Sequence, residues 1–347
     1  MTYFTDVMKE FGSDYHYLPV ESKPAATIHD FYPDANYYAD GRQALAHLYK
    51  SAGWKRLWVP TYFCYDVLKS ISSQGVNLAF YHDNALNDTD SELISLPFTS
   101  GDALLRVNYF GLRGVKHNGA IPVPVVEDHT HDLIGPWATN SDADWCIASL
   151  RKTLPLAEGG ILWSPCGKRL PEKPIVTQFN KELARRRWAS MKMKSLYLKG
   201  KIQDKNVFRL DMTQTEKMFD TMAMSAIDDE TGRYLENFDV MSWYEGKKAN
   251  WKWLKENIDS NLFTVLEPED SRCTPFSLTL LLKDETTRNN FRNYLIENNV
   301  FPAILWTVPD NVSTDVIDFS RKMLSIHCDS RYSGDAISAL CQIIVGC

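Results

Sequence analysis

Two short apolar runs enclose Lys152 in the stretch DWCIASLRKTLPLAEGGILW, residues 144–163. The first run ends just before the lysine, and a Glu-Gly-Gly turn (158–160) leads into the second. Both runs have the pattern of short buried strands. A lysine in this place lies at the carboxyl end of a strand, which is where open α/β sheets bind their ligands. We therefore predict that Lys152 faces a ligand site at the edge of a sheet.

Strand-like and helix-like segments alternate along the chain as far as this stretch. Most of the strand-like runs are continuously apolar, as expected for strands that are buried on both faces. The pattern predicts an α/β fold with a mostly parallel central sheet. Strands are predicted at 55–60, 76–81, 103–108, 122–127, 144–149 and 159–163, and helices at 41–52 and 65–74.

The pattern changes after this region. Residues 180–258 have helical spacing throughout, and the remainder predicts a small α+β domain. Its predicted strands are 262–266, 276–282, 301–306 and 322–327, and its predicted helices are 284–298 and a last one from residue 334. We place the boundary near residue 235. The predicted domains are a large one over 1–235, with an N-terminal arm over 1–40, and a small C-terminal one over 236–347.

Composition excludes several classes of protein. The 347 residues are 44% hydrophobic, which is enough for a sizeable core, and the net charge of −6 argues against a nucleic-acid binder. No run reaches about 18 apolar residues, so we expect no membrane span. The first residues lack the pattern of a signal peptide, and the seven cysteines include no C-x-x-C pair. We expect a cytoplasmic protein with reduced thiols.

Three further segments carry candidate ligand groups. The segment VPVVEDHTHDLIG (123–135) places Glu127 and Asp128 at a strand end, where a carboxylate can cap a helix, bind a metal or pair with a cationic nitrogen. The segment DGRQAL (40–45) opens a helix with a glycine turn, and helix N-termini bind phosphate through free backbone N–H groups. The segment WVPTYFCY (58–65) follows a strand with aromatic side chains that can cover a flat ring.

In this order, the four segments resemble those of fold-type-I enzymes that depend on pyridoxal 5′-phosphate (PLP), specifically the DegT-type sugar aminotransferases. Members of that family have a phosphate-binding helix start, a proline-led aromatic loop, a Glu-Asp strand end and a lysine before a Glu-Gly-Gly turn. The matching segments here are 41–45, 60–64, 127–128 and 152 with 158–160. The resemblance extends over about residues 35–345, because LSIHCDSRY (324–332) is similar to the family's final strand.

The resemblance implies a role for each matching residue. Lys152 would bond to PLP and later move protons, and Asp128 would pair with the pyridinium nitrogen. His131 stands where the family approaches the ring's 3-hydroxyl group. The remaining implied cofactor contacts are at the phosphate group, and they are Gly41, Arg42 and Gln43 with the hydroxyl of Ser149.

The chain departs from the family at several of these positions. Cys64 stands where the family has the aromatic residue that stacks on the cofactor, so we assign that role to Phe63 or Tyr62. The phosphate-binding serine commonly lies five residues before the lysine, where this chain has Ile147, so Ser149 is assigned instead. The Asn-Tyr-Arg signature that the partner subunit contributes in the family is also absent.

The family implies transfer of an amino group from an amino acid, usually glutamate, to a keto or aldehyde acceptor. A nucleotide-linked keto-sugar is the first hypothesis for that acceptor. Enzymes of this type generally form homodimers with sites at the subunit interface, so a homodimer is expected. Arg331, which follows a predicted strand, is a candidate for binding a substrate carboxylate.

Two other interpretations are open. The chain could be a non-catalytic PLP-fold protein in regulation or assembly, although such a protein has no need of both Lys152 and Asp128. It could also be a metallohydrolase, because His129 and His131 alternate on an extended segment and would point the same way toward a metal. Of the other histidines, His327 alone lies similarly at a later strand end.

Overall fold

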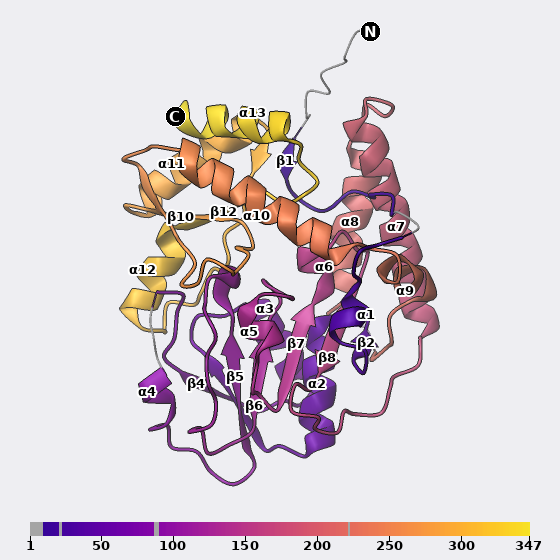
Figure 1. Cartoon of the computed structure of the whole chain (residues 1–347), viewed down its shortest axis with the longest axis vertical. Helices are drawn as coiled ribbons and strands as arrows, with labels where there is room; N and C mark the ends of the chain where they lie inside the picture. Colours follow the sequence, from indigo (N-terminus) through magenta and orange to yellow (C-terminus); the bar gives the residue numbers. More distant parts are fainter. Residues whose placement is uncertain (1–9, 21–22, 87–89, 221–222) are drawn as a thin grey trace.

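The structure is a computed structural model that describes residues 10–20, 23–86, 90–220 and 223–347 (Figure 1). A seven-stranded sheet forms the centre of the N-terminal part, and its strand order is β2-β8-β7-β6-β5-β3-β4. Neighbouring strands from β4 to β7 pair in parallel, whereas β8 and β2 pair antiparallel at one edge. The predicted α/β fold with a mostly parallel sheet is confirmed. The strands are β2 (Asn36–Tyr38), β3 (Arg56–Pro60), β4 (Leu78–Tyr81), β5 (Asp102–Val107), β6 (Val125–Asp128), β7 (Trp145–Ser149) and β8 (Gly160–Trp163).

Alternate residues of these strands are buried on opposite faces of the sheet. On β6, Val126 belongs to the core that includes Leu45 of α2 (Gly41–Ala52), whereas Val125 belongs to the core that includes Trp188 of α7 (Gln178–Leu198). Burial on both faces explains the continuously apolar runs in the sequence. The predicted helix at 41–52 is observed, and Gly53 ends it in the left-handed conformation with φ 67°.

Within the described residues of the region predicted to be helical over 180–258, the helices are α7, α8 (Asn206–Met218), α9 (Asp229–Leu235) and α10 (Val240–Asn257). The chain then forms a three-stranded antiparallel sheet in the order β12-β10-β9. Its elements are β9 (Phe263–Val265), β10 (Leu278–Leu282), α11 (Glu285–Glu297), α12 (Thr314–Lys322), β12 (Met323–Ile326) and α13 (Gly334–Val345). The domain boundary near residue 235 stays a prediction.

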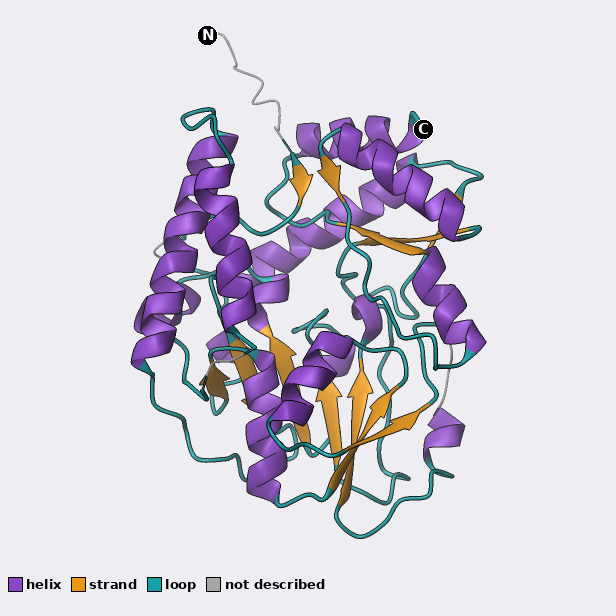
Figure 2. Ribbon diagram, turned by 180° about the vertical axis from the view of Figure 1, so that it is seen from behind, coloured by secondary structure: helices purple, strands orange, loops and turns teal. Residues whose placement is uncertain are grey.

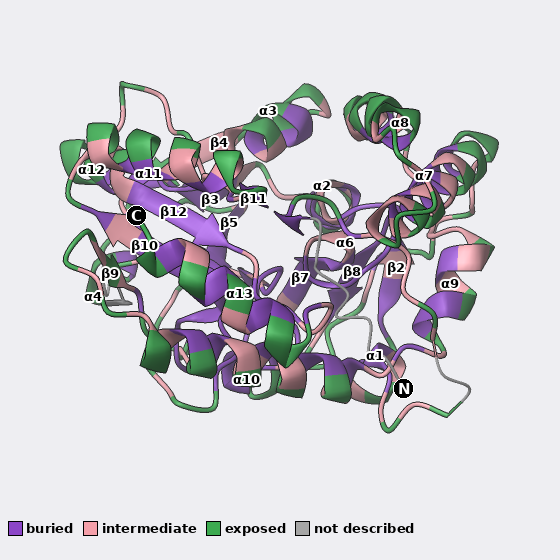
Figure 3. Ribbon diagram, turned by 90° about the horizontal axis from the view of Figure 1, so that it is seen from above, coloured by how far each residue is buried: buried purple, intermediate pink, exposed green. Residues whose placement is uncertain are grey.

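Figure 2 shows the arrowheads of the parallel strands pointing toward this C-terminal part, so the carboxyl edge of the central sheet lies between the two. In Figure 3 the strands β5 and β12 are buried, whereas the peripheral helices α8 and α11 expose most of their turns. None of the described helices is long and apolar enough to cross a membrane.

The remaining short elements are α1 (Ile28–Phe31), α3 (Tyr65–Ser73), α4 (Asp90–Leu93), η1 (Tyr109–Gly111), α5 (Pro136–Thr139) and α6 (Leu150–Thr153). Two further strands are very short. The predicted strand at 301–306 is reduced to β11 (Val300–Phe301), which pairs in parallel with β1 (Phe11–Gly12). Pro302 follows directly and has no N–H to continue a ladder, so the chain leaves the sheet there.

Candidate active site at the carboxyl edge of the central sheet

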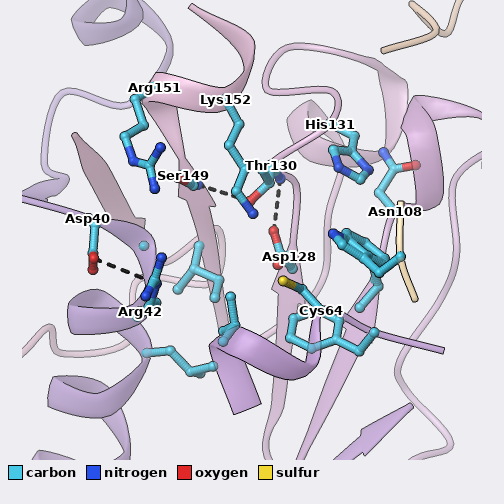
Figure 4. Close-up of a pocket in the computed structure, with 17 residues that line it drawn as sticks. Asp40, Arg42, Cys64, Asn108, Asp128, Thr130, His131, Ser149, Arg151 and Lys152 are labelled. Carbon is cyan, nitrogen blue, oxygen red and sulfur yellow. Dashed lines mark hydrogen bonds and ion pairs between the residues drawn. The ribbon is translucent and has the colours of Figure 1, made fainter. Parts of the chain in front are cut away.

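A pocket lies where β5, β6 and β7 end, beside the first turn of α2 (Figure 4). It brings together most of the residues predicted for the site, although they lie far apart in the sequence. The predicted residues that line it are Gly41, Arg42, Phe63, Asp128, His131, Ser149 and Lys152. It adjoins a larger chamber of about 510 Å³, and both cavities share His131, Arg151, Lys152 and Trp306 in their walls.

The strand ends are tied together beneath the pocket. The backbone N–H of Thr130 donates to Asp128 Oδ1 at 2.9 Å, and the Thr130 hydroxyl accepts the backbone N–H of Ser149 at 2.9 Å. The second carboxylate oxygen of Asp128, Oδ2, has no hydrogen bond within the described part of the chain. These bonds fix the position of Asp128 and leave one of its oxygens free to bind a ligand.

Lys152 belongs to α6, a single helical turn that begins at the end of β7. The backbone N–H of Leu150 donates to the carbonyl of Gly159 at 2.9 Å, which joins this turn to the Glu-Gly-Gly turn. Figure 4 shows the Lys152 amino group extending toward Thr130 and Asp128. Among the described residues it forms no hydrogen bond or ion pair. The fold therefore presents a free amine to the pocket, as the sequence predicted.

His131 is buried at the pocket wall, and its ring has a defined orientation. The backbone N–H of Phe110 donates to His131 Nδ1 at 2.9 Å, so in the neutral ring the proton is on Nε2. Burial, together with the positive charges of Lys152 and Lys247, holds the His131 pKa well below its ordinary value. His131 therefore presents a neutral ring with an N–H donor.

Glycines allow the first turn of α2 to approach the sheet closely. A Cβ atom on Gly41 would lie 3.2 Å from both the Cβ and the backbone nitrogen of Ser149. A Cβ atom on Gly160, in the Glu-Gly-Gly turn, would lie 2.3 Å from the backbone carbonyl of Asp40. Any larger residue at these positions would push the start of the helix away from the pocket.

The backbone N–H groups of Gly41 and Arg42 have no acceptor within the described part of the chain. The N–H of Gln43 differs, because it donates to the side chain of Asp40 at 2.9 Å as the cap of the helix. The Gln43 side chain is also occupied, since it donates to the carbonyl of Ala223 at 3.1 Å. The structure therefore does not bring Gln43 to the predicted anion site.

Three arginines surround one carboxylate at the same end of the pocket. Glu216 of α8 lies 2.7 Å from Arg151, 3.3 Å from Arg187 and 3.9 Å from Arg42. Burial raises the pKa of Glu216, but Arg151 and Arg187 outweigh it and lower that pKa to about 2. Arg42 also pairs with Asp220. Sequence reasoning missed Arg151, although its place beside Lys152 could have indicated it.

The two residues of the aromatic loop (60–64) that were candidates for stacking on a cofactor ring lie in different places. Phe63 and Cys64 line the pocket, whereas Tyr62 is fully buried behind it. The Tyr62 hydroxyl donates to the carbonyl of Leu305 and accepts the backbone N–H of Trp306 at 3.0 Å. Tyr62 therefore does not face a cofactor ring, in contrast to its predicted role. Trp306, which sequence reasoning missed, lines the pocket instead.

Arg331 lines neither cavity, but it packs against Tyr15 and donates to the backbone carbonyl of Asp14 at 3.2 Å, and both of these residues line the larger chamber. Its Nε is 3.0 Å from Asp329 Oδ1, and its guanidinium group packs 4.4 Å from the ring centre of Tyr15 and 5.0 Å from that of Tyr332. The side chain is only 2% exposed. Arg331 thus pairs with Asp329 behind the residues that line the chamber, and its role toward a substrate carboxylate stays a prediction.

The two histidines of the predicted metal pair do not meet. His129 Nε2 lies 3.0 Å from Glu127 Oε2, on the opposite side of β6 from the pocket. Among the described residues, the group that could hold a metal ion consists of Glu127, His129 and Cys146, without His131. The predicted chelate of His129 with His131 is therefore wrong, because each ring is bound in a different place.

The Glu-Gly-Gly turn is anchored by a buried carboxyl. Glu158 Oε1 accepts the backbone N–H of Asp228 at 2.6 Å, and Oε2 accepts the side-chain amide of Asn180 at 2.9 Å. Burial raises the pKa of Glu158 to about 8. The side chain of this residue points away from the pocket and stabilises the turn that supports α6.

No family model and no curated protein matches the sequence. Solved structures do match the fold. The PLP form of the putative sugar aminotransferase Spr1654 from Streptococcus pneumoniae has a TM-score of 0.66 and 10% identity, over 97% of this chain and 98% of that one. PseC from Helicobacter pylori, an aminotransferase involved in the biosynthesis of pseudoaminic acid, has a TM-score of 0.64 and 12% identity, over 97% and 99% of the two chains.

A DegT DnrJ EryC1 StrS aminotransferase from Brucella abortus has a TM-score of 0.57 and 15% identity, over 90% of this chain and 85% of that one. At such low identities the similarity shows the fold. The chain thus has the fold of these aminotransferases along nearly its whole length, and the fold-type-I prediction is confirmed.

Proposed function

We propose that the chain is a PLP-dependent aminotransferase. The observation that carries the proposal is one pocket that holds a free lysine amine, a carboxylate with a free oxygen and a helix start with free N–H groups. PLP requires all three, because it has an aldehyde, a ring nitrogen and a phosphate group. The shared fold supports the same proposal.

The residues present fit this cofactor. Asp128 Oδ2 would hold the ring nitrogen, and His131 Nε2–H would donate to the ring's hydroxyl group. The backbone N–H groups of Gly41 and Arg42 would bind the phosphate, with the Ser149 hydroxyl beside them. When bound, PLP supplies an electrophilic carbon and a ring that stabilises negative charge.

The protein side chains then carry the proton transfers. Lys152 Nζ would hold the cofactor covalently and, when free, would act as the base and acid that moves a proton. Asp128 would keep a proton on the ring nitrogen, because a negative carboxylate stabilises the cationic form. Arg151 adds positive charge near the phosphate end of the pocket.

We further propose that glutamate is the amino donor and that a nucleotide-linked keto-sugar is the acceptor. The adjoining chamber supports this class of acceptor. The residues that line it include Arg187, Lys205 and Arg209, which suit an anionic diphosphate, and Phe276 and Phe301, which suit flat or apolar groups. A homodimer in the cytoplasm, bound to neither nucleic acid nor membranes, completes the proposal.

The first experiment titrates purified protein with PLP and follows the visible absorbance of bound cofactor. We expect a band of lysine-bound cofactor that disappears on addition of glutamate, with release of 2-oxoglutarate. Lys152→Ala should not form this band even where it still binds PLP non-covalently. Absence of any band in the unaltered chain would refute the cofactor assignment. A stable band that responds to no amino acid would favour the non-catalytic PLP-fold protein.

A further inference from the structure

The cofactor pocket has a small side chain where a ring is expected. Cys64 is the residue before α3 and lines the pocket, but its thiol offers little surface to a planar ligand. Planar aromatic ligands gain affinity from parallel contact with another ring. Phe63 of the same loop lines the pocket as well, and a second aromatic surface comes from outside the loop.

Trp306 offers such a surface from the C-terminal part. It is one of four residues that line both the pocket and the adjoining chamber. Its ring lies 5.6 Å from that of His131, with an angle of 19° between the planes, and 5.7 Å from the ring of Phe63. Trp306 thus stands at the junction of the two cavities, beside the aromatic groups that already face the cofactor site.

The backbone around Trp306 is held in place by several hydrogen bonds. The hydroxyl of Tyr62 bridges the carbonyl of Leu305 and the N–H of Trp306. The Ser320 hydroxyl donates to the carbonyl of Trp306 at 2.6 Å, and the N–H of Leu305 lies 3.0 Å from the sulfur of Met323. Side chains from both parts of the molecule therefore fix this residue, as a binding surface requires.

We propose that Trp306 supplies the aromatic surface against the cofactor ring that Cys64 lacks, and that Tyr62 positions it. This proposal rests on the proposed function. It assigns the cofactor site to two distant segments of the chain, the aromatic loop at 60–64 and the segment that follows β11. It also explains why Tyr62 is buried, since its hydroxyl serves the backbone of Trp306 rather than the ligand.

The test measures the dissociation constant of PLP for apoprotein by absorbance titration. We expect Trp306→Ala to weaken PLP binding about 10-fold, because the variant loses one ring contact. Trp306→Phe keeps a ring and is expected to bind within about 3-fold of the unaltered chain. Trp253→Ala is the matched control, because Trp253 is 39% exposed on α10 and lines neither cavity.

Two further variants separate a ring contact from general damage. Adding Cys64→Phe to Trp306→Ala restores a ring from the loop, so we expect it to recover most of the lost affinity. Tyr62→Phe removes the hydroxyl bridge and is expected to weaken binding about 3-fold without changing the binding spectrum. If Trp306→Ala does not fold, Trp306→Leu keeps more of the apolar volume without the ring and replaces it in the comparison.

The outcomes distinguish this proposal from the proposed function. If the unaltered chain binds no PLP, the proposed function itself fails. If the unaltered chain binds PLP and the ring-free variants bind it equally well, only the assignment of Trp306 is overturned. Loss of affinity in Trp306→Ala without recovery by Cys64→Phe would also overturn it, because the effect would then not depend on a ring.

Discussion

Glu127 and Asp128 are neighbours on β6, yet they belong to two regions of opposite character. Glu127 is fully buried, and its carboxylate accepts hydrogen bonds from Asn118 at 2.7 Å, Ser141 at 2.6 Å and His129 at 3.0 Å. Asp128 faces the pocket and accepts one hydrogen bond from the backbone. Successive strand residues point to opposite faces, so adjacent carboxylates can have unrelated roles.

The same contrast holds for the two histidines that follow. His129 belongs to the buried network of Glu127, whereas His131 stands at the wall of both cavities. What separates the two histidines is contact with a cavity rather than residue type. Polar groups whose partners are all protein groups stabilise the fold, and polar groups left open at a cavity are available to a ligand.

The largest expected effect is on turnover, and it comes from removing the Lys152 amine in the pocket. We expect Lys152→Ala to lower aminotransfer at least about 1,000-fold, because no other described side chain of the pocket can replace its bond and its proton transfer. Turnover is measured as release of 2-oxoglutarate, and folding is checked by thermal unfolding. Lys50→Ala, at an exposed position of α2, is the matched control. Substantial turnover by Lys152→Ala would remove the lysine from the mechanism.

Neutralising the two adjacent carboxylates compares the faces directly. Asp128→Asn is expected to lower turnover on the order of 100-fold, since an amide does not stabilise a protonated ring nitrogen. Glu127→Gln makes the same chemical change on the opposite face, and we expect turnover per folded molecule to stay within about 3-fold. Equal losses of turnover in the two variants would show that the carboxylates on the two faces of β6 do not differ in function.

For the free energy of unfolding, we expect the larger loss from a change in the buried network and not from a change at the pocket. His129→Phe leaves the buried carboxylate of Glu127 without its ring N–H donor, so we expect the free energy of unfolding to fall by about 3 kcal/mol. Urea unfolding measures this change, and PLP titration of the folded variant should show unchanged affinity. His131→Phe is the paired variant on the pocket side, and there we expect weaker PLP binding. Weakened PLP binding in His129→Phe but not in His131→Phe would contradict this assignment of the two histidines.

The last comparison concerns the pH dependence of stability. Burial raises the Glu158 pKa to about 8. Burial also acts to raise the Glu127 pKa, but His129, Ser141 and Asn118 together outweigh it, so that pKa is lowered. A raised carboxyl pKa favours the protonated folded state, so stability is highest below the unfolded carboxyl pKa of about 4.3. As pH rises toward 8, Glu158 should lower the unfolding free energy by at most about 1.4 kcal/mol per pH unit.

Urea unfolding at a series of pH values checks this dependence. Glu158→Gln removes the titrating group, so its unfolding free energy should decline less steeply with pH than that of the unaltered chain. Glu127→Gln is the comparison variant, because a carboxyl with a lowered pKa contributes stability above the unfolded pKa and loses it only in acid. Identical slopes for Glu158→Gln and the unaltered chain would contradict the raised pKa.

Sequence patterns predicted the sheet well because they are local. Continuous apolar runs identified the strands that are buried on both faces, and the predicted helix at 41–52 has the observed bounds. Strand β2 escaped prediction, since Asn36–Tyr38 is too short to show a period and is stabilised by its pairing with β8. The pairing of β1 with β11 joins residues almost 300 positions apart, and no local pattern indicates it.

The order of motifs along the chain was enough to place Lys152, Asp128 and the start of α2 in one pocket, because parallel strands bring their carboxyl ends to the same edge. The order of motifs could not reveal which of the predicted site residues would already form hydrogen bonds with other protein groups. Gln43 is used by the helix cap, Tyr62 by the backbone of Trp306, and the predicted metal pair is divided between two faces. Those assignments depend on contacts between distant segments, and such contacts exist only once the chain has packed.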